Sequence, residues 1–344
     1  MITISVCMIV KNEEKVLARC LDSLLGIADE IIIVDTGSTD ATRQIAERYT
    51  DKVYDFTWVD DFSAARNFSF SKASMEYIYV ADADEILEKS EWARFVHLKM
   101  TLDHSVEIVQ MLYTNQLEHG TTYNFDEELR PKLYKRLRDF VWCHPLHETV
   151  RLEPVILDTD IRIRHAPQHS HAGRDFSMFR RAIQRDGGLS EHLVSMYARE
   201  LMISGTASDF EEAIPFFKEQ LEQGKSDTAI RQALCVLTRG ARLTASLDLF
   251  FASALKNVAL GKASSEVCFE LGEYYYFKND IYEAQLWYYN AIYETEPELD
   301  LAAAENKPAA RLAECYEAQG NAKEAAKYRE VEKEFLEKRS QHGG

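Results

Sequence analysis

Three carboxylates follow directly on a short apolar run of this chain. The run covers residues 77–80, and the carboxylates are Asp82, Asp84 and Glu85. Placing them where a strand opens onto a ligand-binding edge costs free energy unless they meet a cation. Oxygen ligands at this density suit Mg²⁺ or Mn²⁺, whose coordination phosphate oxygens and water would complete. An Asp-x-Asp sequence also occurs in solvated turns, so the motif taken alone leaves both interpretations open.

Another carboxylate ends an earlier apolar run. Asp35 follows residues 30–34 and begins the turn Asp35-Thr-Gly-Ser-Thr-Asp40, after which we expect a helix. Thr39 or Asp40 would cap that helix, but capping does not explain Asp35. A carboxylate at a strand end can accept a hydrogen bond from a ribose hydroxyl or a base imide, as in nucleotide-binding sheets. Asp35 is therefore a candidate nucleotide ligand.

A basic residue that suits a diphosphate opens the next expected helix. Arg66 lies in the stretch Trp58-Val-Asp-Asp-Phe-Ser-Ala-Ala-Arg-Asn67. A planar guanidinium can form paired hydrogen bonds to a phosphate, which a single ammonium group cannot do. Arg66 is therefore a candidate diphosphate ligand.

An α/β sheet would position these residues. The apolar runs at residues 4–10, 30–34 and 77–80 are rich in Ile and Val without polar alternation, as expected of parallel strands covered on both faces. Stretches with helical spacing separate them, which predicts right-handed crossovers. Ligands bind beyond the carboxyl ends of such strands, and the polar groups that begin at Lys11, Asp35 and Asp82 all lie there. Shorter strand-like segments follow between about residues 105 and 165.

The chain turns helical from about residue 175 and carries an internal repeat. In residues 266–297, Leu271-Gly272, Tyr275, Ala284, Tyr288 and Ala291 fall at the spacings of a tetratricopeptide repeat. Weaker copies follow and precede it, and an irregular helical bundle is the alternative. We therefore predict an α/β catalytic domain over residues 1–172 and an all-α helical repeat domain over residues 173–344. Such stacks commonly bind a partner on a concave face.

Charge and composition exclude some partners. The 344 residues carry a formal net charge of −17, which repels phosphate backbones and anionic lipids, so nucleic acid and membranes are poor default partners. The apolar run at residues 2–10 is too short to span a membrane and lacks the flanks of a signal peptide. Six scattered cysteines without a CxxC pair fit reduced thiols. We expect a cytoplasmic protein.

Four motifs together resemble the GT-A family of inverting glycosyltransferases, whose catalytic domain is a Rossmann-like mixed sheet. They are Ser5-Val-Cys-Met-Ile-Val-Lys-Asn-Glu-Glu14, Asp35-Thr-Gly-Ser-Thr-Asp40, Phe62-Ser-Ala-Ala-Arg-Asn67 and Asp82-Ala-Asp84. The resemblance covers roughly residues 3–170. The chain looks like bacterial members with C-terminal tetratricopeptide repeats. That group includes the S-glycosyltransferase that modifies the bacteriocin sublancin and also enzymes of surface-polysaccharide assembly.

The resemblance implies roles for the motif residues. Asn12, Glu13 and Asp35 would hold the uridine of a UDP-sugar, and Arg66 would approach the donor. Asp82 and Asp84 would hold Mn²⁺ or Mg²⁺ on the donor diphosphate. A metal on the diphosphate would neutralise the leaving group as the sugar bond breaks.

The base and the third metal ligand are less specific. A His-Glu pair recurs near the acceptor in resembling enzymes, so His147 or Glu148 would remove the acceptor proton; a structural pair that orients a loop is the alternative. His165 ends a strand-like segment and would complete the metal site, which would favour Mn²⁺. His169 and His171 make a zinc site an alternative interpretation, but no cysteine is close in the sequence. Nearby arginines, including Arg162, Arg164, Arg180 and Arg181, would line the diphosphate or form salt bridges.

Other function classes remain open at this point. A nucleotidyltransferase shares an acidic metal site, but its first strand is usually followed by a Gly-rich basic loop, which Lys11-Asn-Glu-Glu14 is not. A non-catalytic repeat protein would not need both Asp82 and Asp84. The acceptor is a protein or peptide side chain (Cys, Ser or Thr) or a glycan, and the repeats favour the peptide. A homodimer is possible.

Overall fold

The structure is a computed structural model, and it describes residues 1–114, 127–137, 142–143, 149–150, 154–166, 172–224 and 226–341. The described residues form two compact units, with Met1 to Arg185 in the first and Asp186 onward in the second. The division therefore falls after most of helix α5 (Ala172–Asp186), whereas the sequence placed the boundary at residues 172 and 173.

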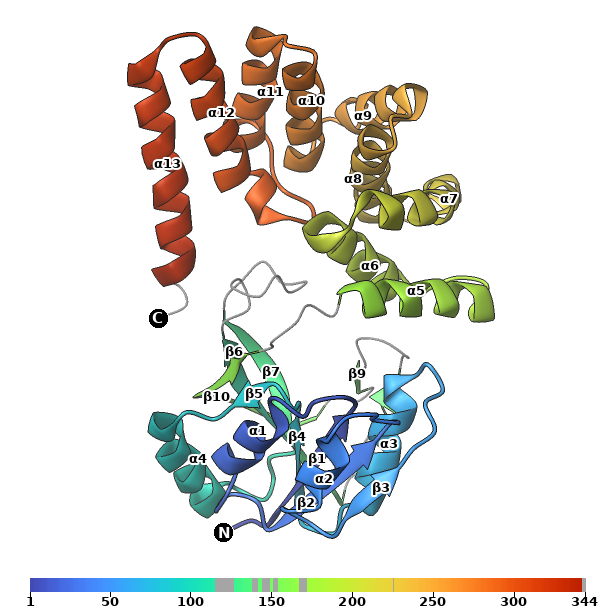
Figure 1. Ribbon diagram of the computed structural model, residues 1–344, viewed down its shortest axis with the longest axis vertical. Helices are drawn as coiled ribbons and strands as arrows, with labels where there is room; N and C mark the ends of the chain where they lie inside the picture. The colour runs from blue at the N-terminus through green and yellow to red at the C-terminus, as the bar shows by residue number, and fades with distance from the viewer. Residues whose placement is uncertain are drawn as a thin grey trace. The chain divides into compact units, whose positions relative to one another are not determined.

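The first unit is built on a mixed eight-stranded sheet (Figure 1). Its strand order is β3-β2-β1-β4-β7-β6-β10-β5. The first four in that order are mutually parallel, while β7 runs antiparallel to both β4 and β6. The bounds are β1 (Ile4–Val10), β2 (Glu30–Asp35), β3 (Val53–Asp55), β4 (Tyr77–Ala81), β5 (Glu85–Ile86), β6 (Ile108–Thr114), β7 (Glu128–Lys135) and β10 (Ile156–His165). A separate two-stranded sheet pairs β8 (Trp142–Cys143) with β9 (Thr149–Val150).

Helices cover both faces of the large sheet. One face packs its apolar residues against α1 (Leu17–Ser23), α2 (Thr42–Ala46) and α4 (Lys89–Thr101). The other face packs against α3 (Phe62–Lys72), through Phe70 and the residue that follows the helix. Coverage on both faces explains why β1, β2 and β4 read as continuous apolar runs. The predicted mixed α/β fold of GT-A type is confirmed.

The second unit consists of helices in the described residues, as the sequence predicted. They are α6 (Glu191–Ser204), α7 (Ala207–Gln223), α8 (Asp227–Leu243), α9 (Leu247–Ala259), α10 (Ser265–Phe277), α11 (Ile281–Tyr293), α12 (Asn306–Ala318) and α13 (Ala322–Gln341), with a short 3₁₀ turn at Leu301–Ala303. Successive helices pack on one another from α7 to α9 and from α10 to α13, and a Cβ added at Gly272 of α10 would lie 2.5 Å from the ring of Tyr288 in α11. The small residue at the predicted repeat position is thus needed for close packing. An all-helical region consistent with tetratricopeptide-like repeats is confirmed.

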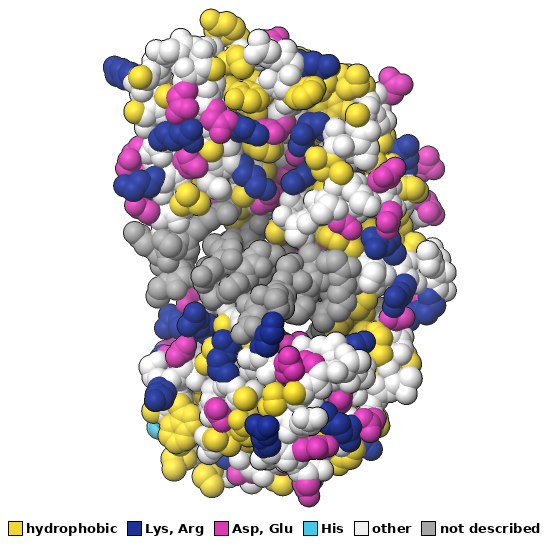
Figure 2. Space-filling model, in the orientation of Figure 1, with side chains coloured by type: hydrophobic (Ala, Val, Ile, Leu, Met, Phe, Trp, Pro, Cys, Tyr) yellow, Lys and Arg dark blue, Asp and Glu magenta, His cyan; other side chains and the backbone are white. Residues whose placement is uncertain are grey.

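Ion pairs join neighbouring hairpins of the second unit. Arg242 of α8 pairs with Glu270 of α10, and Arg311 of α12 pairs with Glu273 of α10, with Nε to Oε1 at 2.6 Å in the latter pair. Acidic and basic side chains are interspersed over the face that Figure 2 shows. The side chains of five of the six cysteines are described, and each is a buried free thiol.

A buried glutamate joins three segments of the first unit at the start of β2. Both carboxylate oxygens of Glu30 are bonded: Ser5 of β1, Lys52 and Ser74 all donate to them, with the Ser74 bonds at 2.8 Å. Burial by itself would raise the pKa of Glu30, but these hydrogen bonds outweigh burial and lower the pKa from 4.5 to about 2. The ionised side chain therefore stabilises the folded state.

We predict that this stabilisation is lost in acid. Because the folded pKa lies below the unfolded one, the contribution is full above pH 4.5 and falls as the pH drops towards 2. Glu30→Gln should be less stable than wild type at pH 7, and this difference should shrink by about 2 kcal/mol at pH 3. Urea unfolding followed by tryptophan fluorescence tests this. Trp58, Trp92 and Trp142 all precede residue 186, so they belong to the same unit as Glu30 and report its unfolding.

Glu47→Gln, at a side chain that is 53% exposed, is the control and should leave the acid limb of the stability curve unchanged. A stability difference between Glu30→Gln and wild type that stays constant from pH 7 to pH 3 would contradict the assigned role of Glu30.

Candidate active site

Asp35 organises the turn at the end of β2. Val10 and Asp35 are partners in the β1–β2 ladder, so the ends of these strands lie side by side. The Oδ1 atom of Asp35, in a residue 5% exposed, accepts the backbone N–H groups of Gly37 at 3.1 Å and Ser38 at 2.8 Å. Gly37 has a φ of 99°, a backbone conformation that glycine adopts without strain. The turn is thus fixed around the carboxylate.

Asn12 and Glu13 clasp the same turn from the end of β1. Asn12 has a φ of 57°, and its Oδ1 accepts the N–H of Thr39 at 2.8 Å. The N–H of Glu13 donates to the hydroxyl of Thr42 at 2.6 Å. The side chain of Asp40 accepts the N–H of Thr42 at 3.0 Å, although the N-cap position of α2 is Ala41. The loops after β1 and β2 therefore form one hydrogen-bonded edge.

Asp82 lies beside the guanidinium of Arg66. The Arg66 Nη2 and Asp82 Oδ1 atoms are 3.4 Å apart, and the Arg66 side chain is 5% exposed, against 45% for Asp82. Arg66 reaches this position because α3, capped by the side chain of Asp61, packs under the sheet. Arg66 and the acidic turn lie in separate sequence motifs, and the fold brings them into contact.

Asp84 meets His165, a residue 81 positions further along the chain. Its Oδ2 lies 3.2 Å from His165 Nε2, and both side chains are about seven-eighths buried, at 14% and 13% exposed. Backbone pairing of β5 with β10 places them, since His165 is the ladder partner of Glu85 and the N–H of Ala166 donates to Asp84 O at 2.9 Å. An oxygen and a nitrogen donor therefore converge at the sheet edge.

This pair fits a divalent cation. Two neighbouring ligands of an octahedral ion, each about 2.1 Å from the metal, lie about 3 Å apart, which is close to the separation of the Asp84 and His165 atoms. Within the described residues, no group of three His, Cys, Asp or Glu side chains is already gathered for metal binding. Asp82 is turned towards Arg66, so water or phosphate oxygens would supply the other ligands.

Three residues of this region were not predicted from the sequence, namely Lys132 and Arg130 on β7 and Tyr113 on β6. Lys132 pairs with Glu85, and both side chains are buried, at 5% and 3% exposed. The guanidinium of Arg130 lies 4.0 Å from the centre of the Tyr113 ring, which is itself 5.3 Å from the His165 ring. The alternation of Arg130 and Lys132 along a strand was the available signal, because residues two apart share a face.

These cations set the charge state of the acidic turn. The partial burial of Asp82 favours its neutral form, but the charges of Lys132, Arg66 and Arg130 outweigh it and lower the pKa of Asp82 to about 2. Burial raises the pKa of Glu85, and the charge of Lys132 opposes this rise and favours the ionised form. Asp82 is therefore ionised at neutral pH, and its charge is paired with that of Arg66.

Other predicted residues are placed elsewhere or lie outside the described residues. His147, Glu148, His169 and His171 belong to segments that the structure does not describe. Three of the nearby arginines form salt bridges: Arg162 with Glu127, Arg164 with Glu88, and Arg181 with Asp60. For these three arginines the structure therefore shows salt bridges, which was one of the two predicted roles.

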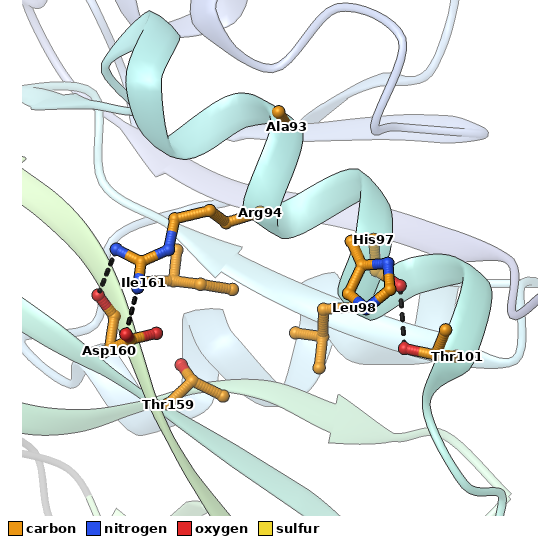
Figure 3. A pocket seen from close by; sticks show the side chains of 8 residues that line it. All are labelled: Ala93, Arg94, His97, Leu98, Thr101, Thr159, Asp160 and Ile161. Atoms are coloured by element: carbon orange, nitrogen blue, oxygen red, sulfur yellow. Dashed lines mark hydrogen bonds and ion pairs between the residues drawn. The ribbon is translucent and has the colours of Figure 1, made fainter.

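A pocket of 420 Å³ lies between α4 and β10 (Figure 3). Arg94, on its wall, is paired with Asp160. The backbone carbonyl of His97 accepts a hydrogen bond from the Thr101 hydroxyl. The pocket shares no lining residue with the groups around Asp35, Asp82 and Asp84. Among the described helices, none is long and apolar enough to cross a membrane.

Comparison with known proteins identifies the family of the chain. The family model described as "Glycosyl transferase family 2" matches residues 5–184. The chain belongs to this family. The matched range contains every predicted site residue, including His165, and ends within α5.

Two curated relatives match parts of this chain. A TPR repeat-containing protein of Synechococcus elongatus is 30% identical over 248 residues, which are 68% of this chain and 60% of the relative. The SPbeta prophage-derived glycosyltransferase SunS of Bacillus subtilis is 33% identical over 117 residues, which are 33% of this chain and 28% of SunS. The chain thus spans less than two thirds of each relative.

Solved structures are more distant. Glucosyl-3-phosphoglycerate synthase from Mycobacterium tuberculosis, in complex with Mn²⁺, UDP and glucosyl-3-phosphoglycerate, is 16% identical with a TM-score of 0.40. The match covers 55% of this chain and 82% of that protein.

Proposed function

We propose that the chain is a metal-dependent inverting glycosyltransferase that moves a hexose or N-acetylhexosamine from a UDP-sugar to a protein or peptide side chain. The observation that carries this proposal is the convergence of Asp84 and His165, 3.2 Å apart, next to Asp82 and Arg66 at the carboxyl edge of the sheet. A mixed nitrogen and oxygen donor set favours Mn²⁺ over Mg²⁺. Membership of glycosyl transferase family 2 supports the reaction class.

The donor half of the site divides between two strand ends. Asp35 Oδ1 is taken up by the turn, so we assign Asp35 Oδ2 to the uracil or ribose. We assign Asn12 and Glu13 an indirect role in uridine binding, because their hydrogen bonds hold the loops that would contact the uridine. Arg66 and Asp82 would face the diphosphate. The sugar attached to the diphosphate would then lie between the nucleotide and the acceptor.

The chemistry follows from charge development at the leaving group. The acceptor oxygen or sulfur attacks the anomeric carbon, the bond from that carbon to UDP breaks, and the acceptor proton passes to a base. A bound cation would stabilise the negative charge of the departing diphosphate, and Arg66 would add a second positive charge. His147 or Glu148 remains our proposed base, outside the described residues.

The acceptor proposal rests on the second unit. Helical repeat stacks present an extended surface that commonly holds a chain in extended form, and the donor residues all precede Asp186. We propose that the repeats hold a polypeptide whose Cys, Ser or Thr side chain receives the sugar. A glycan acceptor is the alternative outcome of the experiments below.

The metal role predicts the effect of Asp84→Asn. UDP release from a UDP-sugar in Mn²⁺ should fall at least about 100-fold, because the leaving group loses the charge that stabilises it. Asp160→Asn, at an exposed carboxylate of the same strand as His165, is the matched control and should keep the wild-type rate. Turnover that survives both Asp84→Asn and EDTA would exclude the metal mechanism.

The uridine role predicts the effect of two substitutions at Asp35. Asp35→Ala should weaken UDP binding by about 1–3 kcal/mol in calorimetry, since a buried hydrogen bond is lost. Asp35→Asn keeps an oxygen for the Gly37 and Ser38 N–H groups but replaces the other oxygen with a donor, so it should also bind weakly. If Asp35→Asn binds UDP as tightly as wild type, Asp35 only shapes the turn.

The division of labour predicts the behaviour of a fragment that ends at Asp186, which retains α5 and its Arg181–Asp60 pair. The fragment should still release UDP slowly, because it hydrolyses the donor. It should no longer transfer radioactive sugar from the donor to the peptides of a proteolytic digest. Far-UV circular dichroism and a cooperative melt must accompany this assay. A folded fragment that labels the same peptides at the full rate would show that the repeats do not select the acceptor.

A further inference from the structure

A buried ion pair lies directly behind the acidic turn. Lys132 of β7 donates to Glu85 of β5, and water reaches little of either side chain, at 5% and 3% exposed. The ammonium also lies 3.4 Å from Val80 O, while the second carboxylate oxygen of Glu85 accepts the N–H of Asp82 at 3.3 Å. The pair thus contacts the backbone on both sides of Ala81, at the point where β4 passes into the turn.

The β4–β7 ladder ends where this ion pair begins, while β4 stays paired with β1 as far as Ala81. The β4–β7 ladder runs from Tyr77 paired with Lys135 to Tyr79 paired with Leu133. Val80 follows on β4 and Lys132 on β7, and the lysine side chain donates to the Val80 carbonyl at 3.4 Å. The residue after that on β7 is Pro131, which has no N–H to donate. On the side of β7, side chains therefore replace backbone pairing at the last residues of β4, whereas β1 pairs with them on the other side.

The fold alone does not call for a charged pair at this position. Replacing a buried ion pair with apolar residues of similar volume is often neutral or stabilising. The sheet around Lys132 already has an apolar core, since Leu133 and Tyr79 are buried. What an apolar pair could not do is accept the Asp82 N–H and supply positive charge behind three carboxylates.

We propose that Glu85 and Lys132 form a positioning pair, which holds the Asp82 turn in the conformation that accepts a divalent cation together with the donor diphosphate. This role rests on the proposed function. Glu85 fixes the backbone of the turn through the Asp82 N–H, and Lys132 neutralises Glu85 so that the charges of Asp82 and Asp84 are left for the cation.

The two single substitutions disturb metal binding for different reasons. Lys132→Met leaves Glu85 buried without its counter-charge and removes the bond to Val80. Glu85→Gln keeps an acceptor for the Asp82 N–H but leaves the Lys132 charge uncompensated, where it repels an incoming cation. If the residues act as a unit, the double variant should resemble the worse single variant and should not show the product of both effects.

The test is calorimetric titration of the full chain with UDP at a series of Mn²⁺ concentrations. Lys132→Met and Glu85→Gln should each raise the Mn²⁺ concentration that gives half-maximal UDP binding at least about tenfold, as loss of residues that orient metal ligands does. A thermal melt of each variant defines the temperature at which it is folded for the titration.

Lys99→Met is the matched control. Lys99 is another buried lysine of the first unit, 7% exposed, with its ammonium 2.6 Å from Asp29 and 2.7 Å from Ile27 O. Asp29 directly precedes β2, so this pair lies at the opposite end of the parallel strands from Asp82. Lys99→Met should lower the melting temperature but leave the Mn²⁺ requirement unchanged.

The outcomes separate this role from the proposed function. Wild-type Mn²⁺ requirements in Lys132→Met and Glu85→Gln would overturn the positioning role and leave the donor site standing. An equal shift in Lys99→Met would overturn it as well, since general loosening would then explain the effect. A wild-type chain that binds no UDP in the presence of Mn²⁺ would overturn the proposed donor site and this role with it.

Discussion

Mutual repulsion of the carboxylates after β4 is the constraint around which the first unit is arranged. Asp82, Asp84 and Glu85 lie within four consecutive positions, and such a group is stable only where positive or hydrogen-bonding partners surround it. Different elements supply them: α3 brings Arg66 to Asp82, β7 brings Lys132 to Glu85, and β10 brings His165 to Asp84. The packing of α3 and the order of the β7, β10 and β5 strands therefore determine the charge of the site.

The parts of this arrangement that depend on local sequence were predictable. Continuous Ile and Val runs indicated β1, β2 and β4, and the polar residues after each run lie at one edge because parallel strands share their carboxyl ends. The approach of Asp84 to His165 was proposed from family resemblance, and the structure brings the two residues together. The helical repeats were readable because Gly272 and Tyr288 must pack closely.

Lys132, Arg130 and Tyr113 were missed because their positions depend on long-range register. Nothing local in Arg130-Pro-Lys132 shows that β7 inserts antiparallel between β4 and β6, and only that insertion puts the lysine behind Glu85. That Asn12 shapes the uridine edge through the neighbouring loop was likewise not visible in the sequence, because its partner Thr39 lies 27 positions away. The boundary between the units was placed before α5, because a helix looks the same in sequence whichever unit it packs on.

The central claim is that Asp84 and His165 bind the cation that holds the donor diphosphate. A crystal structure of the full chain with UDP and Mn²⁺, with anomalous diffraction recorded at the manganese edge, tests it most directly. We expect one anomalous peak within coordination distance of Asp84 Oδ2 and His165 Nε2, with the diphosphate on the side of Asp82 and Arg66. UDP bound without manganese at these two residues, or manganese bound elsewhere, would contradict it.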